Sequence, residues 1–253
     1  MKRLFWDIET SPGIYYSWRS GSKIFIPHDN QLEEAKIICI CYKWEGEKKV
    51  HHLKWELEDD HEMIVEFSFV ADQADEMVAH NGDNFDLKWF NSRNALNGFP
   101  PLPPYKTVDT YKIAKNHFKF DSNKLDALAF IFLGKKKIKT DFELWKQCKA
   151  GKSKALKEMI RYCKRDVVLL EQVYQVLAPY ASPKTHVGVL HGGGRWTCPY
   201  CGSESVIKSK TRPTRMGMTR HQMQCKDCGA YNTVSDLVFR QYKEAKYNEV
   251  VAA

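Results

Sequence analysis

Apolar residues in the first half of the chain recur first with the period of strands and then with that of helices. RLFWDIE (residues 3–9) and KIICICYKW (36–44) predict two strands, and KKVHHLKW (48–55) predicts a third after a short turn. Helical spacing follows over residues 59–75, and a short buried strand is predicted at 76–80. Strands therefore dominate before the first long helical segments begin.

The second half is mainly helical. NFDLKWFNSRNALNG (84–98) predicts a helix that ends near Gly98, and YKTVD (105–109) predicts a short strand. Further helices are predicted at 122–134 and 153–177. Strands first, then alternation, then a helical back half predict an α/β domain in which helices flank a mixed sheet.

The pattern stops at Pro179. The stretch that begins there holds two prolines and three consecutive glycines, which is typical of a linker. We therefore predict a large domain over residues 1–180, a linker over 181–195 and a second domain over 196–236. That second domain is too small to fold on a core of its own, and the tail at 237–253 has a pattern compatible with a helix.

The charge of the chain favours anionic partners. Its 253 residues include 39 Lys and Arg against 31 Asp and Glu, a formal net charge of +8, which suits nucleic acid. Acidic residues interrupt the N-terminal stretch before any apolar run forms, and no segment approaches the roughly 18 apolar residues of a membrane span. We expect a cytoplasmic protein without a membrane partner.

Two carboxylates interrupt the first predicted strand. Side chains alternate along a strand, so Asp7 and Glu9 point to one face and Ile8 to the other. Carboxylates this close repel each other unless a cation neutralises them or one takes up a proton. Oxygen ligands of this kind suit Mg²⁺ or Mn²⁺. An exposed edge strand with solvated acids is the alternative, and this stretch alone does not decide.

Two further stretches carry acids beside apolar residues. Asp86 falls in the first turn of the helix predicted after a short strand. Tyr162 and Asp166 are four residues apart on the longest predicted helix and so share a face. The alternatives are an acid favoured by the helix dipole at Asp86, and a surface polar pair at Tyr162 and Asp166.

In combination, three motifs resemble a known family. DIET, NGDNFD (an NxxxFD motif) and YCKRD (a YxxxD motif) occur in this order, as in the DEDD exonuclease superfamily with a ribonuclease H-like fold. Tyrosine before the last aspartate resembles the tyrosine subgroup (DEDDy), whereas the histidine subgroup would have histidine where this chain has Arg161. YKTVDTYKIAK, FKFDSNKLDALA and TDFELWKQC are similar to stand-alone phage-type exonucleases, and the resemblance spans residues 1–180.

The resemblance implies a mechanism. Asp7, Glu9, Asp86 and Asp166 would hold two Mg²⁺ or Mn²⁺ ions about 4 Å apart. Tyr162 would orient the attacking water, because a phenol is better suited to positioning than to general-base chemistry. Hydrolysis at the 3′ end would release nucleoside 5′-monophosphates.

Several neighbouring residues are weaker candidates. His80 and Asn81 follow a predicted strand near Asp86, where they would contact a phosphate or sugar or serve only the turn. We expect Phe85 in the core and Asp109 as a helix N-cap rather than a fifth ligand. The lysine-rich loop at 134–140 either contacts phosphate or is simply solvated.

The eight cysteines fall into two groups. CPYCG and CKDCG present four thiolates with the spacing of a structural Zn²⁺ site, which would supply the folding energy of the small domain. These four are Cys198, Cys201, Cys225 and Cys228. The segment resembles the zinc ribbons of transposases and other nucleic-acid enzymes, and thiol redox chemistry is the alternative. The other four, predicted to be small buried hydrophobes, are Cys39, Cys41, Cys148 and Cys163.

The ribbon itself is basic. Residues 195–229 include seven basic and two acidic side chains, a difference of +5, and four thiolates on one zinc ion reduce it to about +3. Lys208, Lys210 and Arg212 alternate, so in a regular strand they would form a phosphate-contacting stripe that holds substrate near the nuclease site. The alternative is a ribbon that docks on the main domain or binds a protein partner, such as a replication or repair protein.

Three functions are compatible with the sequence. The first is a metal-dependent 3′→5′ exonuclease on DNA, acting on single-stranded 3′ ends. The second is an exoribonuclease of the same subgroup, since sugar selection depends on the pocket around the 2′ position. The third is a non-catalytic nucleic-acid-binding module, which the presence of all four acids and the tyrosine disfavours.

Overall fold

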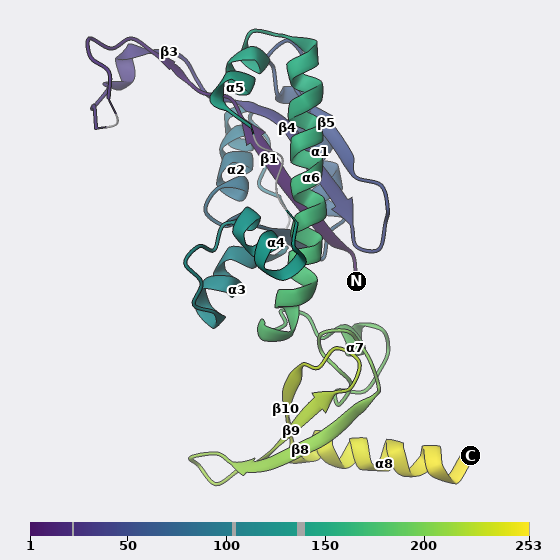
Figure 1. Cartoon of the computed structure of the whole chain (residues 1–253). Helices are drawn as coiled ribbons and strands as arrows, with labels where there is room; N and C mark the ends of the chain where they lie inside the picture. The colour runs from purple at the N-terminus through teal and green to yellow at the C-terminus, as the bar shows by residue number, and fades with distance from the viewer. Residues whose placement is uncertain (22, 103–104, 136–139, 253) are drawn as a thin grey trace. The chain divides into compact units, whose positions relative to one another are not determined.

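The computed structural model describes residues 1–21, 23–102, 105–135 and 140–252 (Figure 1). The chain divides into two compact units. One comprises Lys2–Tyr174, and the other begins at Gln175.

The first unit is built on a five-stranded mixed sheet with the order β5-β4-β1-β6-β7. Its strands are β1 (Arg3–Thr10), β4 (Ile37–Trp44), β5 (His51–Lys54), β6 (Glu76–Ala79) and β7 (Lys106–Asp109). Strand β4 pairs antiparallel with β1 and β5, whereas β6 pairs parallel with β1 and β7. This confirms the predicted α/β fold with a mixed sheet.

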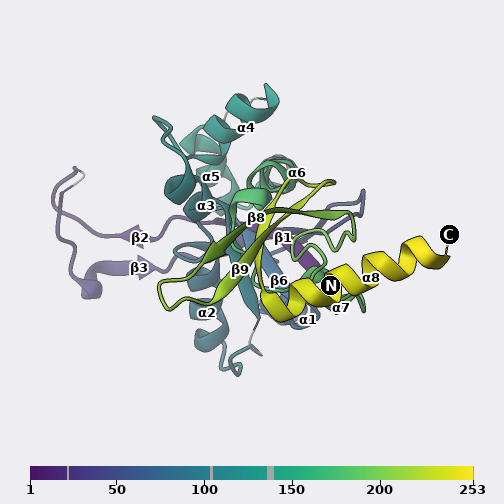
Figure 2. The same ribbon diagram turned by 90° about the horizontal axis from the view of Figure 1, so that it is seen from below.

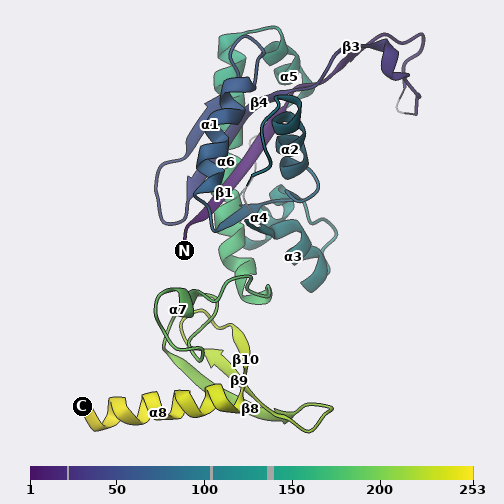
Figure 3. The ribbon, with the colours of Figure 1, turned by 180° about the vertical axis from the view of Figure 1, so that it is seen from behind.

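Helices cover both faces of this sheet. They are α1 (His61–Asp72), α2 (Asp86–Leu96), α3 (Thr110–His117), α4 (Leu125–Leu133), α5 (Phe142–Lys149) and α6 (Ser153–Leu177). Helix α6 crosses one face in Figure 1, and α1 and α2 lie on the opposite face in Figure 3. The long helix therefore lies over the side of β1 that faces away from α1 and α2.

Strand β1 distributes its side chains between these two faces. Leu4, Trp6 and Ile8 are buried in the core that α1 and α2 cover, where the Trp6 ring stacks on Phe67 at 5.1 Å between centroids. The alternate positions, which include the two acids of DIET, face α6 because successive strand residues point to opposite sides. One face of β1 thus builds core under α1 and α2, while the other carries the buried Phe5, which packs on Tyr174 of α6, and then the two acids.

A short hairpin between β1 and β4 extends from the sheet (Figure 1). It contains β2 (Ile14–Tyr15), the 3₁₀ turn η1 (His28–Asn30) and β3 (Gln31–Glu33), and β2 pairs antiparallel with β3. Its large apolar side chains, including Trp18 and Phe25, are exposed. Such short strands carry too few residues for the sequence pattern to reveal them.

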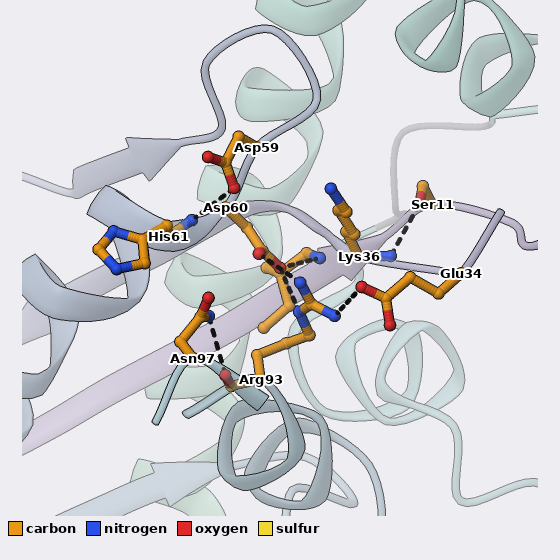
Figure 4. A network of polar contacts seen from close by, with 9 residues as sticks. Ser11, Glu34, Lys36, Asp59, Asp60, His61, Arg93 and Asn97 are labelled. Carbon is orange, nitrogen blue, oxygen red and sulfur yellow. Dashed lines mark hydrogen bonds and ion pairs between the residues drawn. The ribbon is translucent and has the colours of Figure 1, made fainter. Parts of the chain in front are cut away.

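A buried ion pair fixes α2 to the start of β4 (Figure 4). Arg93 on α2 donates to both carboxylate oxygens of Asp60, at 2.8 and 2.9 Å, and to Glu34 at 2.7 Å. Asp60 is fully buried and also accepts a hydrogen bond from the Ile37 backbone amide at 3.0 Å. The bidentate geometry and the extra amide bond satisfy the buried carboxylate, so the first residue of α2, Asp86, belongs to a firmly anchored helix.

We expect Arg93→Met to lower the free energy of unfolding by about 3 to 5 kcal/mol, because it leaves the Asp60 charge buried and unpaired. Urea denaturation measures this. The matched control is Lys146→Met, which removes an exposed pair with Glu143 at 3.1 Å and should change the free energy of unfolding far less, because solvent screens that pair. Equal losses for the two variants would contradict the importance of the buried pair.

The second unit contains a three-stranded antiparallel sheet with the order β10-β9-β8. Its elements are η2 (Ala178–Tyr180), α7 (Val187–Leu190), β8 (Val206–Pro213), β9 (Thr219–Cys225), β10 (Tyr231–Ser235) and α8 (Asp236–Ala252). Helix α8, seen from below in Figure 2, contacts β9 and β10, which Figure 1 labels. Phe239 and Tyr242 from this helix pack in one core with Trp196 and Met223. The predicted small C-terminal sheet is confirmed, and the helical tail shares its core.

Candidate active site

Three carboxylates from two distant parts of the sequence meet on the α6 side of the sheet. Asp7 and Glu9 come from β1 and Asp166 from α6, and one ligand oxygen of each lies within 4.8 Å of the others. Asp166 is buried, whereas Asp7 and Glu9 are half-buried. Hard oxygen donors at this spacing fit a divalent cation such as Mg²⁺ or Mn²⁺.

Asp86 is not one of the three carboxylates within this distance, but it contacts the main chain of β1 between two of them. It is the first residue of α2, and its Oδ1 accepts a hydrogen bond from the Ile8 amide at 3.1 Å, between the two acids of the strand. That amide is available because the parallel pairing of β1 with β6 ends at Phe5 and Val78. The turn before α2 passes so close to β6 that a Cβ at Gly82 would lie 2.3 Å from the Ala79 Cβ.

Burial controls the protonation of Asp86. It raises the pKa of this carboxyl from its usual value near 3.8 to about 7, and the nearby charge of Asp109 acts in the same direction. The hydrogen bond from the Ile8 amide opposes the shift by stabilising the ionised form. A cation among the carboxylates would therefore displace a proton from Asp86.

Tyr162 lies on α6 one turn before Asp166, as the predicted helix requires. Its ring packs edge-on against Trp145 of α5, with 6.2 Å between the centroids. Cys163, the next residue, donates from its thiol to the Asp7 backbone oxygen at 3.4 Å and to Asp7 Oδ2 at 3.6 Å. Helix α6 thus supplies Asp166 and also contacts the carboxylate of Asp7.

The turn before Asp86 is tied to β7 and α3. The Nδ1 of His80 lies 2.9 Å from the Thr110 hydroxyl, and the Asn81 amide donates to Asp109 Oδ1 at 2.9 Å. Asp109 also accepts from the Tyr111 and Lys112 amides, which confirms it as the N-cap of α3. These bonds give His80 and Asn81 a role in the turn, and their contact with a nucleic acid stays a prediction.

Phe85 does not lie in the core, and the prediction that it would is wrong. Its side chain is 41 % exposed and its ring lies 6.3 Å from that of Trp89. Phe85 ends the turn immediately before α2. The exposure of its side chain therefore depends on where the helix lies, which the local sequence pattern does not reveal. Residues 136–139 of the lysine-rich loop are outside the described residues, and the predicted phosphate contact there is not tested.

The two CxxC pairs form a four-thiol cluster. The Sγ atoms of Cys198 and Cys228 are 3.6 Å apart, as are those of Cys201 and Cys225, and all four lie within 4.8 Å of one another. Gly202 and Gly229 have φ of +80° and +75°, so the turn after each pair needs glycine. Tetrahedral sulfurs at a Zn–S distance of about 2.3 Å would be about 3.8 Å apart, so this cluster is compatible with zinc.

The three cations of β8 do not share one face, contrary to the prediction. A bulge between Lys208 and Lys210 shifts the pairing with β9. Lys208 pairs with the buried Met223 and its Nζ lies 5.3 Å from the centre of the Phe239 ring of α8. Lys210 and Arg212 pair with Gln222 and Arg220, on the opposite face. The bulge changes which face each side chain points to, and the spacing of the charged residues in the sequence does not reveal it.

This open face of the ribbon holds a residue that the sequence reasoning missed. Arg220 of β9 stands directly opposite Arg212, and Tyr231 of β10 is exposed beside Gln224. We define the open face as Ile207, Lys210, Arg212, Arg220, Gln222, Gln224, Tyr231, Thr233 and Ser235. It combines three cations with an exposed aromatic ring and has no acidic member. Arg220 belongs to this face because of its pairing with Arg212, and only the register between β8 and β9 reveals that pairing.

Comparisons with known proteins agree with this fold. A sequence model described as the RNase H superfamily matches residues 30–178. No curated protein matches the chain. Among solved structures, the chain is similar to the family B DNA polymerase from the hyperthermophilic archaeon Pyrobaculum calidifontis, with 19 % identity and a TM-score of 0.53 over 70 % of this chain. The match covers 24 % of that polymerase chain and shows a shared fold.

Proposed function

Because the chain belongs to the RNase H superfamily, we propose that it is a metal-dependent 3′→5′ exonuclease that hydrolyses DNA at single-stranded 3′ ends. The observation that carries the proposal is the meeting of Asp7, Glu9 and Asp166 within 4.8 Å, with Asp86 hydrogen-bonded to the amide between the first two. Three carboxylates that converge from a strand and a helix repel one another unless a cation neutralises them or one takes up a proton, so their convergence favours a cation site.

The four carboxylates would hold two Mg²⁺ or Mn²⁺ ions. When bound, such ions lower the pKa of a water molecule and stabilise the charge on the leaving oxygen of a phosphodiester. The backbone of β1 sets the spacing of Asp7 and Glu9, and the Ile8 amide holds the Asp86 carboxylate in a fixed orientation. Bound cations would favour the ionised form of Asp86, because their charge would offset the cost of its burial.

Tyr162 has the role of a positioning group in this proposal. Its place one turn before Asp166 puts the phenol on the face of α6 that carries the acid. A phenol, with a pKa near 10 in water, orients a water molecule by hydrogen bonding rather than removing its proton at neutral pH. The edge-on contact with the Trp145 ring supports the ring of Tyr162 on one side.

Two features favour single-stranded nucleic acid as the substrate. Phe85 is exposed immediately before Asp86, and Tyr231 is exposed on the open face of the ribbon. Exposed aromatic rings stack on unpaired bases, and nearby cations follow the phosphate backbone.

A cytoplasmic location and a replication or repair partner remain part of this proposal.

A panel of labelled strands tests the substrate. With a 5′ label, single-stranded DNA should shorten progressively in the presence of Mg²⁺ or Mn²⁺, whereas with a 3′ label the first product should be a mononucleotide. Duplex DNA with blunt ends should be degraded more slowly, and RNA of the same sequence should be a poorer substrate. Faster degradation of RNA would instead assign an exoribonuclease, and no degradation of any strand would contradict the proposal.

The open face of the ribbon makes a separate prediction. Arg212 and Arg220 are paired directly across β8 and β9, and like charges in that position destabilise a sheet unless an anion lies between them. We expect the triple variant Lys210→Gln, Arg212→Gln and Arg220→Gln to weaken binding of single-stranded DNA and to reduce the salt slope of log K by about 2, at 0.7 per cation. Fluorescence anisotropy at several salt concentrations measures both.

Lys208→Gln is the matched control for this experiment. It removes one cation from the same strand, but from the face that α8 covers, so it should leave the salt slope nearly unchanged. A triple variant that binds DNA with the wild-type salt slope would show that the open face does not contact the phosphates.

A further inference from the structure

Three of the remaining cysteines converge beneath the carboxylates. Cys39 and Cys41 lie on β4, where they pair with Glu9 and Asp7 of β1, and Cys163 comes from α6. Paired residues on neighbouring strands point to the same face, so the two thiols stand on the α6 side of the sheet beside the two acids. The three side chains are fully buried, at 0 % exposure, and form what we term the thiol triad.

The triad has the dimensions of a metal site. Its three Sγ atoms lie within 4.8 Å of one another, the same limit that the four ribbon thiols meet. A cation with metal–sulfur bonds of about 2.3 Å needs its sulfurs about 3.8 Å apart, so the triad needs to contract by 1 Å or less. The fourth buried cysteine of this unit, Cys148, does not belong to the triad.

We propose that the thiol triad is a binding site for a soft, thiophilic cation such as Cd²⁺ or Zn²⁺. Cys39, Cys41 and Cys163 would each lose the thiol proton to solvent as the corresponding metal–sulfur bond forms. Three thiolates on a divalent ion carry a net charge of −1, and thiolates select soft cations over Mg²⁺. The site's sulfur donors differ from the oxygen donors of the carboxylate group, which suit hard cations.

The triad is in contact with the carboxylates. The Cys163 thiol donates to Asp7, at 3.6 Å from Oδ2, and this bond is lost once the sulfur binds a cation. Asp7 offers two oxygens near this sulfur, its main-chain oxygen at 3.4 Å and Oδ2 at 3.6 Å. A bond from Oδ2 to the cation would complete a four-coordinate site and draw this carboxylate away from Mg²⁺. We therefore expect a thiophilic cation in the triad to slow hydrolysis, an effect that rests on the proposed nuclease function.

Cadmium titration of the full-length, zinc-loaded protein tests the site. Thiolate-to-cadmium charge-transfer absorbance and the metal content after gel filtration should give two cadmium ions per chain, one in the ribbon by exchange and one in the triad. Cys41→Ala and Cys163→Ala should each bind one. Cys148→Ala is the matched control, since it removes a buried thiol of the same unit outside the triad, and it should bind two. Circular dichroism confirms that each variant is folded.

One cadmium ion per chain in the wild-type protein would overturn the proposal, as would two ions in both folded triad variants. The effect on hydrolysis has its own comparison, in which Cd²⁺ at a fixed Mg²⁺ concentration should inhibit the wild type several-fold more than Cys41→Ala. Equal inhibition of the wild type and Cys41→Ala would contradict the inference that a cation in the triad slows hydrolysis through Asp7. If the protein does not hydrolyse DNA even without cadmium, the nuclease function is contradicted. The number of cadmium ions bound per chain still tests the thiol triad in that case.

Discussion

Removal of the zinc ion that we propose for the four-cysteine cluster should unfold the C-terminal sheet while the unit Lys2–Tyr174 keeps its structure. The core of the smaller unit is built from few buried apolar residues, and two of its members, Cys198 and Cys225, are thiols of the four-cysteine cluster. In a site of this kind the free energy of metal binding is also the free energy of folding, about 10 to 16 kcal/mol for zinc-finger peptides at neutral pH. A core of this size cannot replace that contribution.

Hydrogen exchange measured by mass spectrometry, with and without a chelator, locates the effect. Amides of β8, β9 and β10 should lose their protection, whereas those of β1 and β4 should keep it. Cys198→Ser should reproduce the loss, because it removes one ligand, and Cys148→Ser should not, because its thiol lies outside the cluster. Full protection of the ribbon strands after zinc removal would show that the cluster is not the source of their stability.

Replacement of Asp86 by asparagine should abolish hydrolysis and at the same time stabilise the metal-free protein. The amide oxygen of asparagine can still accept the hydrogen bond from Ile8, so the local structure should survive. Loss of a carboxylate that holds a catalytic cation should slow hydrolysis by at least about 10³-fold, roughly 4 kcal/mol on the barrier.

The stability change depends on pH in a defined direction. The pKa of Asp86 is about 7 in the folded protein against about 3.8 in the unfolded chain, so the folded state holds the proton more tightly. The free energy of unfolding of the metal-free wild type should therefore fall as pH rises from about 4 to about 7, by up to about 4 kcal/mol. Asparagine does not titrate, so Asp86→Asn should be the more stable protein at pH 8 and the difference should vanish near pH 4.

Chemical denaturation in EDTA at several pH values measures this difference. Lys146→Met, at an exposed position, is a control whose difference from wild type should not vary with pH in this way. The account would be contradicted if Asp86→Asn were less stable than the wild type at pH 8, or if the difference did not depend on pH. Either result would show that ionisation of the buried Asp86 does not lower the free energy of unfolding.

Patterns local in sequence predicted much of the fold. Helix α6 was predicted with its observed bounds, because its apolar residues keep a helical period over seven turns. Strand β1 was predicted because its alternating residues divide between core and acid. The short strands β2 and β3 were missed, since two or three residues do not establish a period.

Features that depend on pairing across the sheet were not predictable from the sequence. The bulge between Lys208 and Lys210 reverses the face of one cation, and only the register with β9 reveals it. The thiol triad depends likewise on the register that sets Cys41 beside Asp7. The three motifs of the carboxylate group were identified by their resemblance, in combination, to a known exonuclease family, whereas the meeting of Asp7, Glu9 and Asp166 depends on the topology.

The most direct test of the account is the release of nucleoside 5′-monophosphates from single-stranded DNA by the wild type and Asp166→Asn, measured side by side with Mg²⁺ and with EDTA. Asp166 joins the group from α6, more than 150 residues after Asp7 and Glu9, so its effect tests the convergence itself. The account predicts release by the wild type with Mg²⁺ alone and a loss of at least about 10³-fold in the variant. Release that survives EDTA or the substitution would contradict a metal-dependent carboxylate centre.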